Sequence, residues 1–160
     1  MYKVLFVCLG NICRSPLAAA VFANKLKEKN SDLVFEIDSA GTHNYHAGKP
    51  ADERVLLMLN DRNIEINHLA RRIELKDFDY FDYIFAMDEN NYEAIHKLAP
   101  NKNYKAKIVQ FRKYDPYSQG SLTVPDPYYG DMKDFQVVYN IIDDTLENLY
   151  DRFSQGLEVN

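Results

Sequence analysis

The sequence predicts an α/β three-layer sandwich, in which a parallel sheet is covered by helices on both faces. Apolar runs of strand length alternate along the chain with segments whose apolar residues recur at helical spacing. The runs are almost continuously apolar, which is typical of strands buried on both faces. The chain has 160 residues, 46% of them hydrophobic, and we expect one domain spanning residues 1–160.

The first elements form a β-α-β unit. The apolar run Tyr2–Val7 ends in a short loop, and Ser15 and Pro16 supply the cap and the first-turn proline of the helix that follows. The apolar residues of this helix recur at helical spacing as far as a polar stretch that starts at Glu28. A second strand over Leu33–Asp38 completes the unit, whose crossover we expect to be right-handed.

The rest of the chain continues this alternation and ends in the clearest helix, which carries a long apolar stripe. We expect the remaining elements to be a helix from Pro50 to about Arg62, a mostly irregular stretch over Asn63–Arg72, a short helical turn over Glu74–Phe78, a strand over Tyr83–Met87, a helix from Asn90 to about Leu98, a short strand over Lys107–Gln110, and a helix from Asp134 to about Phe153.

One long stretch, Arg112–Gly130, breaks the alternation. It contains three prolines and two glycines and has little periodicity. Long loops in compact domains are more often functional than ordinary connections are. We therefore expect this loop to contribute residues to a site.

Composition excludes several classes of partner. Nineteen Lys and Arg against 24 Asp and Glu give a net charge of −5, so we expect neither nucleic acid nor a membrane surface as a partner. No basic leader or membrane-length apolar run is evident, and we expect a cytoplasmic protein. Cys8 and Cys13 are too few for a disulfide scaffold or a zinc site, so we expect free thiols and no metal.

Three polar side chains stand at or just beyond the ends of predicted strands: Cys8, Ser39 and Asp88. Ligands of parallel α/β sheets bind beyond the carboxyl ends of the strands. One site could therefore draw on these distant parts of the chain.

The loop after the first strand fits a phosphate group. Five residues separate Cys8 from Arg14, and their backbone N–H groups can curl inward to form an anion-binding nest at a helix start. Gly10 would permit unusual backbone angles, Asn11 tolerates a left-handed conformation and can brace the loop, and Arg14 can clasp two oxygens with its planar fork. The candidate phosphate-binding residues are Leu9, Gly10, Asn11, Ile12, Cys13 and Arg14.

The same loop would activate Cys8. A helix N-terminus and a nearby guanidinium favour the thiolate over the thiol, which makes Cys8 a nucleophile at neutral pH. It would face a phosphorus atom held by the groups that activated it, so attack would give a phosphocysteine intermediate.

Expulsion of the leaving oxygen requires a proton donor. Asp126 is the better candidate, because Pro125 and Pro127 place its carboxyl on a stiff bend next to tyrosines that could wall a planar leaving group. Asp115 in the same loop is the rival, and composition does not exclude it.

The sequence resembles the low-molecular-weight protein tyrosine phosphatases over essentially its whole length. The motifs that carry the resemblance occur in the family's order: the loop Val7–Pro16, then Asp38–Gly41, Phe81–Asp88 and Asp126–Gly130. The resemblance implies a four-stranded parallel sheet flanked by helices, no metal and no other cofactor. It also implies hydrolysis of phosphotyrosine or other aryl phosphate monoesters, on a protein or a small molecule, with Cys8, Arg14 and Asp126 catalytic.

The resemblance assigns further roles that spacing alone cannot. It implies that Asn11, Ser39 and His68 brace the phosphate loop and that Ser15 eases departure of the thiolate in the second step. It places Tyr45, Tyr128 and Tyr129 in the pocket wall, with Tyr45 where some members have tryptophan. Cys13 matches a second loop thiol that forms a protective disulfide with Cys8 under oxidation. We expect a monomer.

Two alternatives remain. An arsenate reductase can use the same scaffold, but those that pass electrons through protein thiols need cysteines beyond the loop, and this chain has only two. A phosphate-binding module without turnover would require neither Cys8 nor Asp126. We therefore favour the phosphatase.

Overall fold

The computed structural model describes residues 1–101 and 103–160. The strands are β1 (Tyr2–Cys8), β2 (Phe35–Gly41), β3 (Tyr83–Ala86) and β4 (Lys107–Gln110). The helices are α1 (Arg14–Glu28), α2 (Glu53–Asp61), α3 (Asp77–Tyr80), α4 (Glu89–Leu98), the 3-10 helix η1 (Phe111–Tyr114) and α5 (Met132–Ser154). Within the described ranges, no helix has the length and apolar character needed to cross a membrane.

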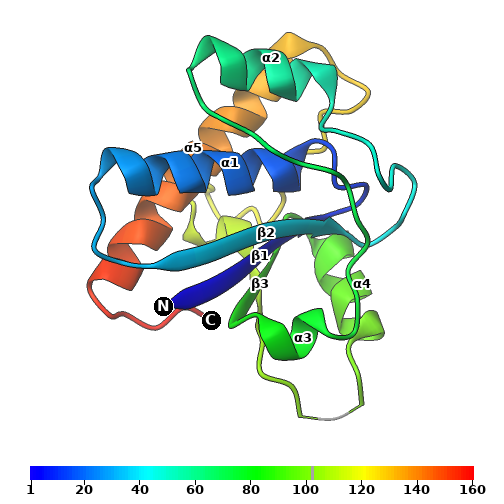
Figure 1. The fold of residues 1–160 in the computed structure, drawn as a ribbon, viewed down its shortest axis with the longest axis vertical. Helices are drawn as coiled ribbons and strands as arrows, with labels where there is room; N and C mark the ends of the chain where they lie inside the picture. Colours follow the sequence, from blue (N-terminus) through cyan, green and yellow to red (C-terminus); the bar gives the residue numbers. More distant parts are fainter. Residues whose placement is uncertain (102) are drawn as a thin grey trace.

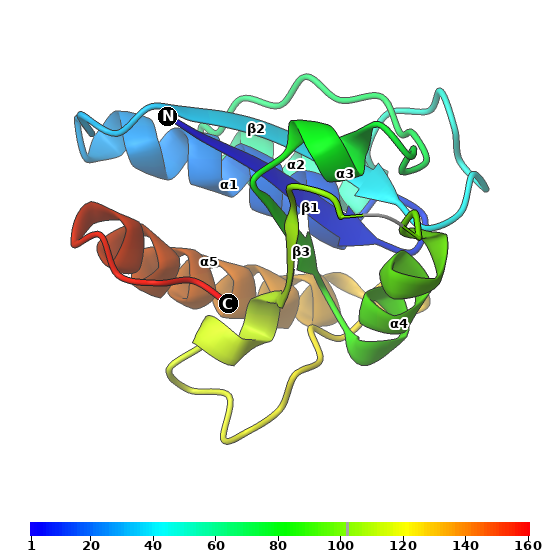
Figure 2. The ribbon, with the colours of Figure 1, turned by 90° about the horizontal axis from the view of Figure 1, so that it is seen from below.

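The four strands form one parallel sheet in the order β2-β1-β3-β4. Helices α1 and α5 lie on one side of the sheet and α3 and α4 on the other, with α2 next to α5 (Figures 1 and 2). The strand order changes direction at β1, because β1 pairs with β2 on one side and with β3 on the other. The predicted three-layer sandwich is therefore confirmed, with β1 at the centre of the sheet.

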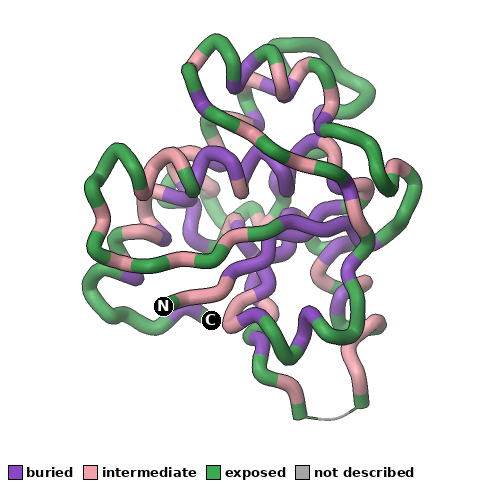
Figure 3. Tube along the Cα trace, in the orientation of Figure 1, coloured by how far each residue is buried: buried purple, intermediate pink, exposed green. Residues whose placement is uncertain are grey.

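The core has two parts, one on each face of the sheet. Val4 and Phe6 of β1 pack with α1, α2 and α5, whereas Leu5 and Val7 pack with α3 and α4. All four side chains are completely buried, and buried chain is concentrated along β1 and the first half of α1 (Figure 3). Burial of both faces explains why this strand lacks the polar alternation of a half-exposed strand.

Several predicted boundaries were wrong by a few residues. β2 starts at Phe35 and continues to Gly41, because Ser39, Ala40 and Gly41 pair with the end of β1. α5 starts at Met132 rather than at residue 134, because Asp131 forms a capping box with the residue three positions later. The loop after β4 begins with η1, which the sequence pattern did not indicate.

The cap predicted for the first helix was also wrong. α1 starts at Arg14 with Cys13 as its N-cap residue, and no side chain caps it. Ser15 lies inside the first turn, and its hydroxyl contacts Cys8 and Asn11 instead. This serine contributes to the loop before the helix rather than to the helix end.

Candidate functional site

The loop of residues 9–13 joins the carboxyl end of β1 to the N-terminus of α1. Its carbonyl groups are held from the outside: those of Leu9, Asn11 and Ile12 accept hydrogen bonds from the His43 N–H (3.1 Å), His68 Nε2 (2.7 Å) and the Asp52 N–H (2.9 Å). The C=O and N–H of a trans peptide point in opposite directions, so the following N–H groups face away from these partners. Within the described chain, no N–H of residues 9–13 donates to a protein acceptor. The loop is therefore a nest of available donors.

Asn11 braces this nest from its centre. Its φ is 58°, as predicted for a left-handed residue, and its side chain is completely buried. Its Nδ2 donates to Ser15 Oγ at 2.8 Å and to Ser39 Oγ at 3.0 Å. Its Oδ1 accepts from the backbone N–H of Arg71 at 2.9 Å. One side chain thus ties the loop to α1, to β2 and to the segment of residues 68–73.

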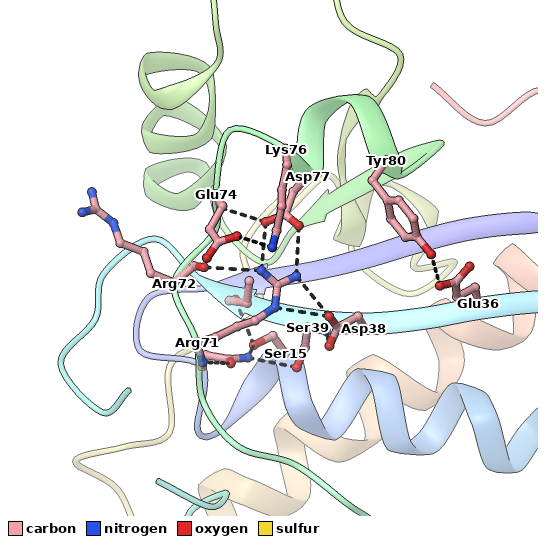
Figure 4. A network of polar contacts seen from close by, with 12 residues as sticks. Ser15, Glu36, Asp38, Ser39, Arg71, Arg72, Glu74, Lys76, Asp77 and Tyr80 are labelled. Atoms are coloured by element: carbon pink, nitrogen blue, oxygen red, sulfur yellow. Dashed lines mark hydrogen bonds and ion pairs between the residues drawn. The ribbon is translucent and has the colours of Figure 1, made fainter. Parts of the chain in front are cut away.

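An ionic cluster fixes the segment of residues 68–73 in turn (Figure 4). The guanidinium of Arg71 donates to Asp38 at 3.0 Å and to Asp77 at 2.9 and 3.1 Å. The backbone carbonyl of Arg71 accepts a hydrogen bond from the N–H of Gly41 at 2.8 Å. Arg71 and Asp38 also line an open groove of about 640 Å³ beside α3. Since these charges pair with one another, we assign the cluster a structural role behind the loop.

The two glycines of the site serve close packing. A Cβ on Gly41 would lie 2.8 Å from the Leu9 carbonyl oxygen, so the strand end could not approach the loop with any larger residue. A Cβ on Gly10 would lie 3.0 Å from His46 Cδ2. The expectation of unusual backbone angles at Gly10 was wrong, because the positive φ of the loop falls on Asn11. Gly10 leaves room for a histidine at the rim instead.

The two cysteines have different environments, although both are free thiols and both are buried. Cys8 ends β1, and its Sγ lies 2.9 Å from Ser15 Oγ, which can donate a hydrogen bond to a thiolate. Burial and the nearby charge of Asp52 raise the pKa of Cys13 far above its ordinary value. Cys13 is therefore a neutral thiol at physiological pH, and Cys8 is the cysteine placed to act as a nucleophile.

Arg14 is buried, with 2% of its surface exposed, and three acceptors surround its guanidinium. Nη1 donates to Asp88 at 2.6 Å and to the Val124 carbonyl at 3.0 Å, and Nη2 lies 3.4 Å from an Asp126 oxygen. Burial disfavours its charge, but Cys8, Asp88 and Asp126 outweigh that effect and raise the pKa of Arg14. A permanent cation therefore lies between the thiol and the long loop.

The structure distinguishes the two aspartates of that loop. The carboxyl of Asp126 is 40% exposed and faces Arg14. Asp115 is buried at the end of η1, where its oxygens accept from Arg112 Nε at 3.0 Å and from the Tyr117 N–H at 2.9 Å. Only Asp126 is both accessible and directed towards the phosphate loop.

His68 holds the loop as a neutral side chain. Burial lowers its pKa below the ordinary value of 6.5, and the hydrogen bond to the Asn11 carbonyl opposes this only in part. Because a carbonyl can only accept, Nε2 carries the proton, and Nδ1 faces Ser39 Oγ at 3.5 Å. His68 and Ser39 thus both contact Asn11, His68 through the backbone carbonyl of Asn11 and Ser39 through its side-chain amide.

Two histidines near the phosphate loop each pack against a tyrosine ring. Tyr128 lies 5.9 Å from His46 between ring centroids, and Tyr45 stacks on His43 at 4.9 Å. Tyr129 packs edge-on against Tyr128 and is 96% exposed. Tyr45 and Tyr128 thus lie beside histidines that approach the phosphate loop, Tyr129 is the more exposed of its pair, and a pocket wall built from the three tyrosines stays a prediction.

Sequence reasoning missed two contributors to the site and the role of a third. Asp88 was expected near the site from its position at a strand end, but its pairing with Arg14 had no local signal. Arg71 acts through its backbone N–H, and Arg54 donates to the carbonyls of Tyr128 and Gly130, so neither forms a recognisable motif. In the described part of the chain, no group of three or more His, Cys, Asp or Glu side chains is placed to hold a metal ion.

Comparison with known proteins places this geometry in a family. Residues 3–158 match the family model described as low molecular weight phosphotyrosine protein phosphatase. The chain is 47% identical over 138 residues to the low molecular weight phosphotyrosine protein phosphatase of Rattus norvegicus, covering 86% of each chain. It superposes on a protein tyrosine phosphatase from Entamoeba histolytica with a TM-score of 0.89 at 40% identity, covering 98% and 99% of the two chains. It also superposes on a drosophila arginine phosphatase with a TM-score of 0.89 at 32% identity, covering 94% and 97%. The chain belongs to the low molecular weight phosphotyrosine protein phosphatase family.

Proposed function

We propose that this protein hydrolyses phosphotyrosine and related aryl phosphate monoesters through a phosphocysteine intermediate. The observation that carries the proposal is the loop of residues 9–13, whose N–H groups have no protein acceptor in the described chain and which lies between Cys8 and Arg14. Such donors suit the three equatorial oxygens of a phosphoryl group in transfer. Family membership and the position of Asp126 support the same reaction.

The reaction has two steps. In the first, the thiolate of Cys8 forms an S–P bond as the P–O bond to the phenol breaks, and Asp126 gives its proton to the leaving oxygen. In the second, Asp126 takes a proton from water, whose oxygen attacks phosphorus, and the S–P bond breaks to release phosphate and the thiolate. Ser15 Oγ, at 2.9 Å from the Cys8 sulfur, stabilises that departing thiolate. Arg14 and the loop N–H groups hold the phosphoryl oxygens in both steps.

The aromatic rim supports an aryl leaving group. Tyr128 and Tyr45, with the histidines beside them, offer flat surfaces for a phenyl ring. The resemblance to an arginine phosphatase makes phosphoarginine the competing substrate, and a comparison of phosphate release from phosphoarginine and from phosphotyrosine distinguishes the two. An arsenate reductase and a module without turnover are not favoured, because the relatives are phosphatases.

The remaining expectations are part of the proposal. They are a single domain over residues 1–160 that acts as a monomer in the cytoplasm on a protein or small aryl phosphate, with neither nucleic acid nor a membrane as partner. A chain of 160 residues has the size of one domain, and its net charge of −5 disfavours binding to polyanions. Oxidation by a peroxide would convert Cys8 to a sulfenic acid; the Cys13 sulfur would then bond to the Cys8 sulfur as the S–O bond breaks, the hydroxyl leaving as water with the Cys13 proton, to give a protective disulfide.

The experiment compares the two aspartates of the long loop. The wild-type protein should release phosphate from aryl phosphates in the presence of a chelator and be inhibited by vanadate. Asp126→Asn should slow turnover by about 10²- to 10⁴-fold, the usual contribution of general acid–base catalysis. Asp115→Asn is the matched control and should retain the wild-type rate constant in molecules that remain folded. The opposite pattern would move the proton donor to Asp115.

A further inference from the structure

We infer that Arg54 is a positioning residue for proton transfer, because it fixes the loop that carries Asp126 to the start of α2. The inference rests on the proposed function, in which Asp126 is the acid. It assigns Arg54 no contact with the substrate, and its effect would be seen only through Asp126.

Arg54 makes two hydrogen bonds to the backbone just after the acid. Its Nη1 donates to the Gly130 carbonyl at 2.9 Å, and its Nη2 donates to the Tyr128 carbonyl at 2.9 Å. These carbonyls lie two and four residues beyond Asp126. The planar fork of one side chain therefore holds both carbonyls of the turn that follows the acid.

Arg54 is itself held firmly. Its Nε and Nη2 each lie 2.9 Å from an oxygen of Asp52, and its guanidinium lies 4.3 Å from the ring centroid of Phe135. The N–H of Asp52 donates to the Ile12 carbonyl at 2.9 Å. A continuous series of bonds thus runs from the phosphate loop through Asp52 and Arg54 to the segment that carries the acid.

The acid needs this support because its own contacts are few. In the described chain, the carboxyl of Asp126 contacts Arg14 at 3.4 Å and the Tyr128 N–H at 3.1 Å. A bound phosphate dianion would compete for Arg14, which would leave Asp126 held by its local turn. The orientation of that turn then depends on Val124 before the acid, whose N–H donates to the Met87 carbonyl at 2.8 Å, and on Arg54 after it.

The test varies how much proton donation the substrate needs. A strongly acidic phenol can leave phosphorus as the phenolate with little help, whereas the weakly acidic phenol of tyrosine needs a proton on its leaving oxygen. The readout is kcat/KM, which reports the first step alone, because the second step also uses Asp126 and is common to both substrates. With an aryl phosphate of a strongly acidic phenol, Arg54→Gln should keep kcat/KM within about threefold of wild type, whereas with phosphotyrosine kcat/KM should fall by about 10- to 100-fold, in line with the cost of misplacing a catalytic group by about 1 Å. The kcat/KM of Arg54→Lys with phosphotyrosine should lie between those of wild type and Arg54→Gln, since an ammonium cannot reproduce the planar fork of a guanidinium.

Arg62 provides the matched control at the other end of α2. It donates to Gln136 at 2.6 Å, lies 4.1 Å from the ring centroid of Tyr139, and has no described contact with the acid's loop. Arg62→Gln should leave the ratio of the two rates unchanged. In an Asp126→Asn background, Arg54→Gln should cause no further loss with phosphotyrosine, because it acts only through the acid.

The outcomes separate the inference from the proposed function. Equal losses with both substrates, or a further loss in the Asp126→Asn background, would show that Arg54 is merely structural and would overturn the inference alone. A wild-type protein inactive on both substrates would overturn the proposed function and the inference together. An Arg54→Gln protein that hydrolyses phosphotyrosine at the wild-type rate would also overturn the inference.

Discussion

Replacing Asn11 with alanine tests how the phosphate loop is held. The substitution removes the side-chain bonds to Ser15, Ser39 and the Arg71 N–H. Three bonds at about 1 kcal/mol each give about 3 kcal/mol. Alanine at a φ of 58° adds about 1 kcal/mol of steric cost. The free energy of unfolding should therefore fall by about 4 kcal/mol, which for a chain of this size lowers Tm by about 8–16 °C.

Asn63 isolates the backbone part of this cost. Its φ is 55°, it is exposed, and its side chain makes no described hydrogen bond, so Asn63→Ala should cost only about 1 kcal/mol. Urea denaturation at fixed pH measures the free energy of unfolding of both variants. If the dependence of that free energy on urea concentration is the same as in wild type, the substitution has changed stability alone. If Asn11→Ala costs no more than Asn63→Ala, the three side-chain bonds do not hold the loop and the reasoning is refuted.

Two further predictions follow from the environments of His68 and Cys13. Because burial lowers the pKa of His68 below 6.5, the unfolded chain takes up a proton at a higher pH than the folded one. Above a pH of about 6.5 His68 is neutral in both states, and its full contribution to stability is present. That contribution is lost as the pH falls through the pKa of His68 in the folded protein. The free energy of unfolding should therefore decrease from pH 7 to 5, and His68→Gln should reduce that slope; an unchanged slope would contradict it. Because burial raises the pKa of Cys13, iodoacetate at neutral pH should alkylate Cys8 and spare Cys13. Peptide mapping checks this, and preferential labelling of Cys13 would contradict it.

The sequence was sufficient for the sheet and for the loop at its centre. The mostly continuous apolar run Tyr2–Val7 is the pattern of a strand covered on both faces, and both faces of β1 are covered. The spacing of Cys8 and Arg14 was sufficient to predict a loop whose N–H groups are left available between the two residues, because both positions are local to one loop. The left-handed conformation of Asn11 was also predictable, since asparagine adopts it more readily than most residues do.

Features that depend on distant backbone could not be predicted. Gly10 and Gly41 look alike in the sequence, but Gly41 is required by the approach of the Leu9 carbonyl, which lies on another strand end. Ser15 resembles a helix cap, yet its hydroxyl faces Cys8 and Asn11, because the loop curls back over the first turn. Arg54 and Arg71 act through backbone groups of other segments, and such contacts have no signature in residue types.

The most direct test of the central claim is to trap the phosphorylated enzyme. A radiolabelled aryl phosphate is mixed with the protein and quenched in acid within a single turnover, and the label is mapped to a peptide. The label should be found on Cys8, should persist longer in Asp126→Asn, which lacks the base for the second step, and should be absent in Cys8→Ser. Label on another residue, or full activity of Cys8→Ser, would contradict the account.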